Sequence, residues 1–466
     1  MSLSVLPRRH EDTQGWVFLR VFVPSWVILF LVVVTGIVPG TGAPADGSEP
    51  QMSWLDDGTI RLGVDLQIGG AITWLSRSGD TTNLINSFDW GRQVQMSYYA
   101  GPVPFVAGTK RPSKYWEGLG WNPIQAGDAY GHRARLLEQR NDGHSLYVKC
   151  IPMQWPLDDV PGECTFESWL ELEGPVVHAR CRLANARSDR TFQAARTQEL
   201  PAVYTNGPWH RIISYTGAKP FTNDAVTQLE AKPPPRWDAW DATENWSALV
   251  DDAGYGLGVW NPDCVRFVGG FNGQPGAGGP KENPCGYLAP QRWEILDHDI
   301  THEYRYDLVL GTVEEIRAYV GRQPRTVLPA WLFSRDRQGW HYERATDTGW
   351  PIHDTLVVQL TQDDPAMISP RFVAKAEVAP VLVIEAAFEN VAAPQAQIFW
   401  SSLEQPGFEQ SRSVRFEGNA DGAFHEYRLR AADLPGYRGA ITQLRFDPAD
   451  KAGGTVRIRS IRFAGE

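Results

Sequence analysis

The sequence predicts an all-β protein with two β-sandwich units behind an N-terminal apolar segment. The 466 residues include 44 glycines and 34 prolines, and this frequency of helix breakers excludes a helical bundle. Segments that alternate apolar and polar residues recur along the chain, as half-buried strands require. Only residues 313–320 have the pattern of a helix.

Residues 1–45 have the pattern of a signal peptide or a membrane anchor. The 18 residues 21–38 contain no charge and follow Arg20. Ala43-Pro44-Ala45 then has the A-x-A form of a signal-peptidase site. We expect cleavage after Ala45, although a run of this length also suffices as an uncleaved anchor. In either case the body is expected to be exported: periplasmic, secreted or anchored at the cell surface.

Residues 50–322 are expected to form the larger sandwich. Asp57-Gly58 separates two strands, and Asn141-Asp142-Gly143 is a hairpin turn. Residues 177–183 and 304–310 alternate apolar and polar side chains, the period of strands with one buried face.

The end of this unit carries the expected helix. Thr312 and Glu315 have the spacing of a capping box, and Gly321 follows as a stop signal. Residues 323–335 contain two prolines and are expected to be a linker. Residues 336–466 show further alternating segments at sandwich spacing and are expected to form the second, smaller unit.

Net charge and cysteine spacing restrict the partners, metal sites and disulfides that we expect. The net charge is −11 and no basic run is longer than a pair, so we expect no nucleic-acid partner. Contact with a membrane is expected only through the N-terminal segment. The cysteine spacing matches no zinc pattern. Cys150 with Cys164, and Cys264 with Cys285, each bracket a loop that we expect a disulfide to close. Cys181 is expected to be a buried free thiol.

Both units resemble folds of carbohydrate-active proteins. GGAITWLSR (69–77), GRQVQMSYY (91–99) and HEYRYDLVLG (302–311) resemble the galactose-mutarotase-like β-supersandwich, which aldose epimerases and several polysaccharide lyases share. LRFDPADKAGGTVRIRSIRF (444–463) resembles a jelly-roll carbohydrate-binding module. The resemblance implies a β-supersandwich followed by a C-terminal β-jelly-roll sandwich. The Asn-His-x-x-Phe-Asn stretch expected of a working aldose epimerase is absent.

QELPAVYTNGPWHR (198–211) holds the preferred catalytic candidates, Glu199 and His210. Glu199 lies among apolar and aromatic residues, where a carboxyl has a raised pKa that suits acid–base work on a sugar. His210 lies in a Gly-Pro loop, where functional side chains are frequent. The alternative for Glu199 is a structural ion pair with Arg196 or Arg211.

His302 is the third catalytic candidate. His298 lies four residues before it, about 13 Å away along a strand, so the two cannot hold one metal ion and no metal is expected. Glu303 and Arg305 share the polar face of the same strand and are expected to bind a sugar by bidentate hydrogen bonds. An exposed, ion-paired strand face is the alternative.

Further substrate-binding candidates are Arg92 and Gln95, on or beside a strand whose face is rich in amides and hydroxyls. Indoles in loops are typical stacking surfaces for pyranose rings. The chain has 19 tryptophans, and seven fall in loop-like segments: Trp116, Trp121, Trp155, Trp209, Trp237, Trp240 and Trp246. Of these, Trp121, Trp209 and Trp246 are expected to bind substrate, with core packing as the alternative for each.

These features predict an exported carbohydrate-active protein. Glu199, with His210 or His302, would act on a polysaccharide or oligosaccharide by general acid–base chemistry, as a hydrolase, lyase or epimerase. The alternative is a non-catalytic glycan-binding protein of the cell surface. No cofactor is expected apart from a structural calcium, for which Asp363 and Asp447 are candidate ligands.

Overall fold

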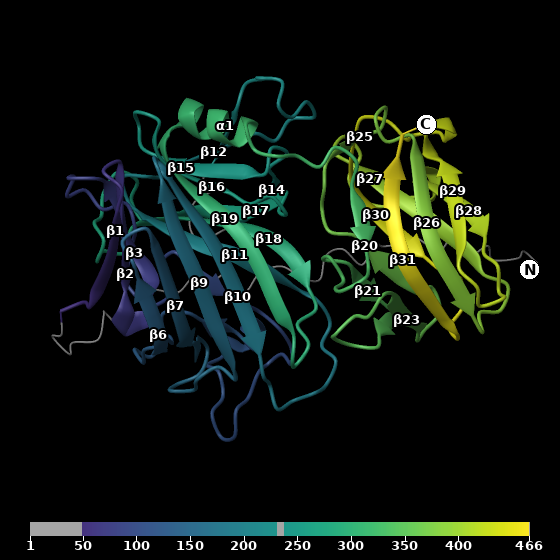
Figure 1. Ribbon diagram of the computed structural model, residues 1–466, viewed down its shortest axis with the longest axis horizontal. Coiled ribbons are helices and arrows are strands. Elements are labelled where there is room, and N and C mark those ends of the chain that lie inside the picture. The colour runs from purple at the N-terminus through teal and green to yellow at the C-terminus, as the bar shows by residue number, and fades with distance from the viewer. Residues whose placement is uncertain (1–48, 231–236, 466) are drawn as a thin grey trace, which may run out of the picture.

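The computed structural model describes residues 49–230 and 237–465, which form five antiparallel sheets (Figure 1). The expected signal or anchor segment, residues 1–45, lies outside the described residues. Strands up to residue 312 build three sheets, and strands from residue 330 build the other two. We call these the N-terminal part and the C-terminal part. The predicted all-β fold class is confirmed.

Two large sheets form the sandwich of the N-terminal part. The nine-stranded sheet has the order β13 (Thr227–Leu229), β12 (Arg211–Ser214), β15 (Trp246–Val250), β16 (Tyr255–Trp260), β19 (Thr301–Thr312), β10 (Val176–Asn185), β9 (Cys164–Glu173), β7 (Ser145–Ile151) and β6 (Arg135–Asn141). The seven-stranded sheet has the order β14 (Asp238–Asp241), β17 (Arg266–Asn272), β18 (Cys285–Glu294), β11 (Arg196–Asn206), β4 (Gln95–Ser97), β5 (Pro123–Ile124) and β8 (Met153–Gln154).

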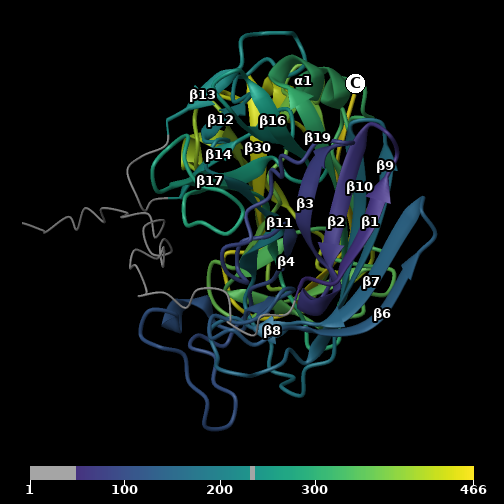
Figure 2. The ribbon, with the colours of Figure 1, turned by 90° about the vertical axis from the view of Figure 1, so that its left-hand side faces the viewer.

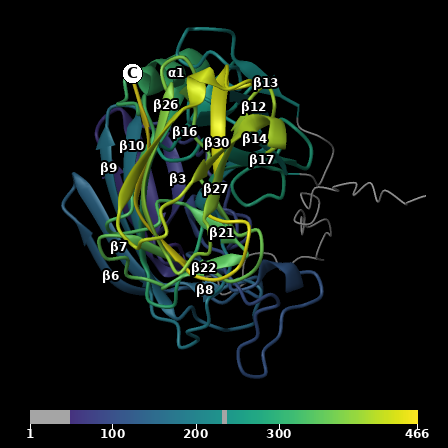
Figure 3. The same ribbon diagram turned by 90° about the vertical axis from the view of Figure 1, so that its right-hand side faces the viewer.

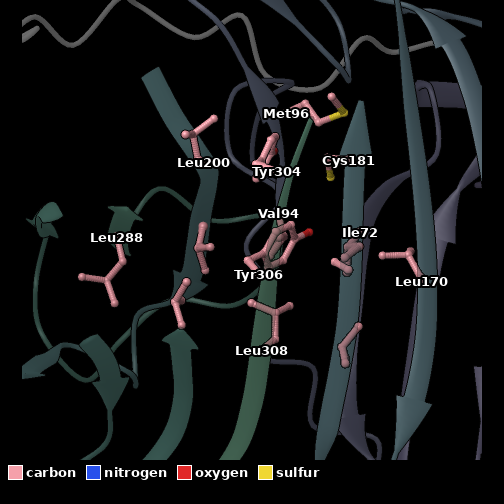
Figure 4. Packing of buried hydrophobic residues seen from close by; sticks show 14 of the residues in the cluster. Ile72, Val94, Met96, Leu170, Cys181, Leu200, Leu288, Tyr304, Tyr306 and Leu308 are labelled. Carbon is pink, nitrogen blue, oxygen red and sulfur yellow. The ribbon is translucent and has the colours of Figure 1, made fainter. Parts of the chain in front are cut away.

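The main core fills the space between these sheets (Figure 4). Tyr304 and Leu308 of β19 face Leu200 of β11 and Leu288 of β18 within one hydrophobic cluster. The expected alternation of residues 177–183 and 304–310 is confirmed, because their apolar members belong to this cluster.

A three-stranded sheet of β1 (Met52–Asp56), β2 (Ile60–Asp65) and β3 (Ala71–Arg77) lies beside the sandwich (Figure 2). The predicted helix is α1 (Val313–Gly321), and its capping box is confirmed. The Glu315 carboxylate accepts from the Thr312 amide at 2.8 Å, and the Thr312 hydroxyl accepts from the Glu315 amide at 3.3 Å. The described residues also include four short 3-10 helices, Leu66–Ile68, Glu117–Leu119, Gln410–Arg412 and Ala431–Asp433. In the part of the chain described here, no helix is long and apolar enough to cross a membrane.

The C-terminal part is a second sandwich (Figure 3). It has its own hydrophobic cluster. One sheet has the order β22 (Ala345–Asp347), β23 (Leu356–Leu360), β31 (Thr455–Ala464), β26 (Val381–Glu389) and β29 (His425–Arg430), and β20 (Ala330–Leu332) also pairs with β31. The other has the order β21 (His341–Glu343), β24 (Ala366–Ile368), β30 (Ala440–Asp447), β27 (Gln395–Ser402) and β28 (Ser413–Glu417), and β25 (Ala374–Lys375) pairs with β30. Residues 330–332 of the expected linker, 323–335, thus form strand β20. That each part folds as a separate domain stays a prediction.

Buried polar side chains join the two parts. Arg337 is 4% exposed and donates from Nη2 to Asp347 Oδ1 at 2.8 Å within the C-terminal part. Its Nη1 donates to Asp297 Oδ2 of the N-terminal part at 2.5 Å. His341 stacks on Trp293, the penultimate residue of β18, with ring centroids 5.2 Å apart.

The expected disulfides are wrong, because all five cysteines are buried free thiols. Cys150 pairs with Phe166, which makes Cys164 its diagonal neighbour, about 7–8 Å away and beyond the usual disulfide span. Cys264 lies in the main core, whereas the Cys285 sulfur contacts Arg92 outside it, at 3.6 Å. Sequence spacing does not reveal the side of a sheet on which a thiol lies.

Gly207 holds together two loops that border the seven-stranded sheet. Its amide donates to Gly278 O at 3.2 Å and its carbonyl accepts from Gly276 N at 3.0 Å. A Cβ on Gly207 would lie 1.5 Å from the Ala277 carbonyl oxygen.

We expect Gly207→Ala to lower the free energy of unfolding by about 1–3 kcal/mol, the usual cost of overpacking. Urea denaturation measures this loss. Gly321→Ala is the matched control, since a Cβ there meets nothing within 4 Å. Equal stability of the two variants would contradict the packing argument.

Candidate functional site

The outer face of the seven-stranded sheet carries side chains in rows that cross the strands. Strand pairing places Glu199 between Gln291 of β18 and Ser97 of β4. Gln291 pairs in turn with Arg266 of β17, and Arg266 pairs with Asp241 of β14. Directly opposed residues of antiparallel strands point to the same face. These five side chains therefore form one polar row.

An aromatic row lies parallel to the polar row, four residues away along β18. Tyr204 of β11 pairs with Tyr287 of β18, and their ring centroids are 4.8 Å apart. Trp237, which precedes β14, packs on Tyr287 at 4.9 Å. The positions between the two rows hold small residues, including Ala202 and Ala289. Because these side chains are short, the Tyr287 ring has room to extend across them to the polar row.

The Tyr287 hydroxyl donates a hydrogen bond to Glu199 Oε1 at 2.5 Å. Burial raises the pKa of Glu199 above its ordinary value, and the hydroxyls of Tyr287, Ser97 and Tyr99 offset part of that effect. The raised pKa agrees with the apolar and aromatic sequence around Glu199. The alternative of an ion pair does not occur for Arg196, which donates to the carbonyls of residues 118 and 119.

Three phenols surround this carboxylate. Burial raises the pKa of Tyr99, Tyr204 and Tyr287 well above 10, and the nearby Glu199 charge adds to the shift. The three hydroxyls therefore stay neutral at physiological pH and act as hydrogen-bond donors rather than bases.

Arg92 lies on the far side of the aromatic row from Glu199. Its Nη1 donates to Asn283 O at 2.7 Å and to Asn283 Oδ1 at 2.9 Å, while Nε lies 3.2 Å from Asp89. Its charge lowers the pKa of Tyr204, opposing burial and Glu199. Two predicted residues, Glu199 and Arg92, thus act on the same phenol. We call the following set the Glu199 face: Arg92, Ser97, Tyr99, Glu199, Tyr204, Trp237, Asp241, Arg266, Tyr287 and Gln291.

The structure does not bring His210 to Glu199. The His210 Nδ1 lies 3.1 Å from Pro208 O, and Nε2 lies 3.5 Å from Asp252 Oδ1. Its ring contacts Phe271 edge-on, with centroids 6.0 Å apart. None of these partners belongs to the Glu199 face.

His302 lies inside the sandwich, 7% exposed, on the opposite side of the seven-stranded sheet from Glu199. Its Nδ1 is 3.0 Å from the Tyr98 hydroxyl, and its Nε2 is 3.4 Å from Glu294 Oε1. Arg292 also donates to Glu294, so the three groups form a buried polar cluster.

Gln95 lies on β4 next to the Glu199 face, but its side-chain amide forms hydrogen bonds with backbone groups. Its Nε2 donates to Trp90 O at 3.0 Å, and its Oε1 accepts from Ala126 N at 2.9 Å. Gln95 therefore positions the loops beside the face.

The three tryptophans expected to bind substrate are buried in hydrophobic clusters. Trp121 and Trp209 belong to the main core, and Trp246 to a smaller cluster under α1. Trp237 is the loop tryptophan that reaches the Glu199 face, while Trp116 and Trp155 contact each other at 5.6 Å. Loop composition does not reveal the direction in which an indole points.

Glu303 and Arg305 lie exposed on the outer face of the nine-stranded sheet. Glu303 accepts from Arg182 Nε at 2.6 Å, and Arg305 pairs in register with Arg180. This is the ion-paired strand face named as the alternative, on a different sheet from Glu199.

The candidate calcium ligands are engaged by cations. Asp363 pairs with Lys451 at 2.8 Å, and Asp447 pairs with Arg445 at 2.7 Å. This donor set does not fit a calcium ion, which needs several carboxylate or carbonyl oxygens. Within residues 49–230 and 237–465, no three His, Cys, Asp or Glu side chains gather as metal ligands.

Sequence patterns do not identify Tyr287, the partner of Glu199, nor Gln291, Arg266 and Asp241. Tyr287 and Gln291 are in CGYLAPQRWE (285–294), whose alternate residues share one face of β18. That period predicts which residues face the same way, but not which strand lies beside them.

Comparison with known proteins gives likeness at the level of fold. No protein-family model and no curated protein matches the chain. A galactose mutarotase-like protein from Lactobacillus casei is 10% identical, with a TM-score of 0.36 over 56% of this chain and 99% of the other. A galactose mutarotase-like protein from Clostridium acetobutylicum is 8% identical, with a TM-score of 0.35 over 55% and 94%.

A 4-alpha-glucanotransferase from Thermococcus litoralis is 12% identical, with a TM-score of 0.30 over 57% of this chain and 40% of the other. Two of these three proteins are described as galactose mutarotase-like, the fold that the sequence resembles. At these identities and TM-scores we draw no conclusion about chemistry from them, and the function proposed below rests on the Glu199 face itself.

Glu199→Gln is expected to change stability in a pH-dependent way. Because the pKa of Glu199 is raised in the folded protein, the wild type loses stability as pH rises through that pKa. The glutamine variant lacks this loss, so its stability relative to wild type should increase from acidic to neutral pH. Chemical denaturation across that range measures it, and a difference independent of pH would contradict the raised pKa.

Glu294→Gln should show the opposite pH dependence, with a stability relative to wild type that decreases from acidic to neutral pH. Burial opposes ionisation of Glu294, but Arg292 and His302 outweigh it and lower its pKa from 4.5 to about 2. The stabilisation is present above the ordinary pKa and fades as pH falls towards 2. We expect a loss of about 3 kcal/mol at neutral pH that shrinks in acid, measured by the same denaturation series. A variant as stable as wild type at pH 7 would exclude the buried pair.

Proposed function

We propose that this protein binds a glycan on the Glu199 face and acts on it by general acid–base chemistry, with Glu199 as the group that moves the proton. The observation that carries the proposal is the half-buried Glu199 carboxyl with its raised pKa, held by Tyr287 beside further aromatic rings. A carboxyl whose pKa is raised keeps its proton to a higher pH than an exposed carboxyl does, which suits a general acid–base group. Tyr204 and Trp237 add ring faces suited to the C–H groups of a sugar.

Of the three reaction classes left open by the sequence, the arrangement favours an epimerase or a lyase over a hydrolase. Most glycoside hydrolases use two carboxyl groups about 5–9.5 Å apart. The other carboxylate of the polar row, Asp241, is three strands from Glu199, about 14 Å by strand spacing. It is also bound by two arginines. Proton transfer at a sugar carbon or hydroxyl needs one base and one hydrogen-bond donor, and in this proposal Glu199 is the base and the Tyr204 hydroxyl is the donor.

In this proposal Glu199 accepts the proton in its ionised form and returns it in its protonated form. The neutral phenol of Tyr287 donates to the carboxylate and orients it. Tyr204 offers a neutral hydroxyl to an oxygen on which negative charge develops. Arg92, fixed by Asn283 and Asp89, supplies positive charge behind the aromatic row.

The second candidate function is glycan binding without turnover. It is favoured by the contacts of Glu199, which among the described residues include hydroxyl groups but no imidazole and no second carboxylate. Binding through tyrosine and tryptophan faces needs no proton transfer. For either function we also propose export of the protein, supported by the apolar residues 21–38 and the Ala43-Pro44-Ala45 site.

A glycan array read for both retained protein and released or altered sugar tests the proposal. We expect Glu199→Gln to reduce turnover by at least about 100-fold, the usual contribution of a positioned general acid–base group, while binding persists. Glu171→Gln is the matched control, because it makes the same change at an exposed position on the other sheet.

Binding by wild type without any product would favour the second candidate and exclude catalysis. Neither binding nor turnover on any glycan would overturn both. Turnover that survives Glu199→Gln at the wild-type rate would remove Glu199 from the chemistry.

A further inference from the structure

Two arginines from different parts of the molecule share one carboxylate at the end of the polar row. Arg266 of β17 donates from Nη1 to Asp241 Oδ1 at 3.0 Å. Arg371, three residues after β24 in the C-terminal part, donates from Nη1 to Asp241 Oδ2 at 3.0 Å. Among the described residues, Asp241 is the only acidic side chain that pairs with either arginine. The three groups carry one excess positive charge.

These guanidinium groups have unused hydrogen-bonding capacity. Each contributes a single nitrogen to Asp241, whereas a guanidinium has five N–H donors. The side chains are 33% exposed for Arg266 and 27% for Arg371. Burial and the adjacent Arg266 charge lower the pKa of Arg371 despite Asp241. The surroundings of the pair therefore favour a second anion.

The pair lies within reach of a glycan that contacts Glu199. Arg266 is two strands from Glu199, with Gln291 between them, a separation of about 10 Å at ordinary strand spacing. Arg266, Gln291 and Glu199 all belong to the polar row, on one face of the sheet. A sugar held at Glu199 and extended along this row would pass Gln291 and meet the arginines.

We propose that Arg266 and Arg371 bind an anionic group of the glycan, a carboxylate or a sulfate ester, so that the C-terminal part completes the binding site on the N-terminal part. The inference rests on the proposed function, because the glycan must lie on the Glu199 face. Guanidinium groups bind carboxylate and sulfate through paired hydrogen bonds. The net charge of −11 repels an anionic polymer as a whole, so a local cationic pair is what such a ligand requires.

The test uses acidic glycans paired with neutral counterparts. Uronate-containing oligosaccharides are presented beside their carboxyl-reduced forms, and sulfated ones beside their desulfated forms. For the full chain we expect binding to at least one acidic member to exceed its neutral counterpart by about tenfold or more, an advantage that weakens as salt is raised. The uronate and sulfate pairs distinguish the two sources of the anion.

Arginine variants then test whether Arg266 and Arg371 bind the anionic group. Arg266→Gln and Arg371→Gln should each remove most of the acidic advantage, and Arg371→Lys should retain part of it. Arg428→Gln is the matched control on the exposed strand β29 of the C-terminal part. Thermal denaturation of each variant shows whether it is folded, and the wild-type ratio of acidic to neutral binding can refute the inference without any variant.

Equal binding of acidic and neutral members would overturn this inference and leave the proposed function standing. An acidic preference that both arginine variants keep would place the anion elsewhere and overturn it too. Failure to bind any glycan would overturn the proposed function, and this inference with it.

Discussion

The Glu199 face depends on an irregularity in the pairing of β11 with β18. Glu199 pairs with Gln291, and the register shifts before pairing resumes at Val203 with Leu288. Strict alternation would place Glu199 and Val203 on one face. The irregularity instead lets Val203 enter the core while Glu199 stays outside with Tyr204. A single strand thus contributes both to the core of the sandwich and to the polar and aromatic rows on its outer surface.

Two glutamates show how the sheet separates environments. Glu199 and Glu294 lie on neighbouring strands but on opposite faces. Glu294 lies beside Arg292 inside the sandwich, and its pKa is lowered. Glu199 meets neutral phenols, which stabilise its charge less than a guanidinium would, and its pKa is raised. The residue type is the same, and the neighbouring charge decides whether the pKa of the carboxyl is lowered or raised.

Local sequence patterns predict the parts of this structure that depend on local physics. The strand period appears in residues 177–183 and 304–310, and the capping pair marks the start of α1. The setting of Glu199 is also local, because its apolar neighbours follow it directly in the chain. The partner of Glu199 is not local: Tyr287 is 88 residues away, and no periodicity reveals that β11 and β18 are neighbours.

The same limit explains the histidines and tryptophans. His210 is close to Glu199 in sequence, but the turn between β11 and β12 directs it towards Asp252. Trp121, Trp209 and Trp246 lie in polar stretches, yet each buries its indole, because the hydrophobic effect acts on the side chain and not on the composition of the loop.

The bridge from Arg337 to Asp297 bears on how this protein can evolve. Appended sandwiches can be exchanged between enzymes when they are tied to their neighbours by little more than a tether. Here the guanidinium that neutralises Asp347 in one part also neutralises Asp297 in the other, and all three groups are shielded from water. Loss of the C-terminal part would leave Asp297 without its cationic partner, whereas Arg337 and Asp347 would remain paired without the N-terminal part. The two sandwiches are therefore expected to be inherited together, as one unit of selection.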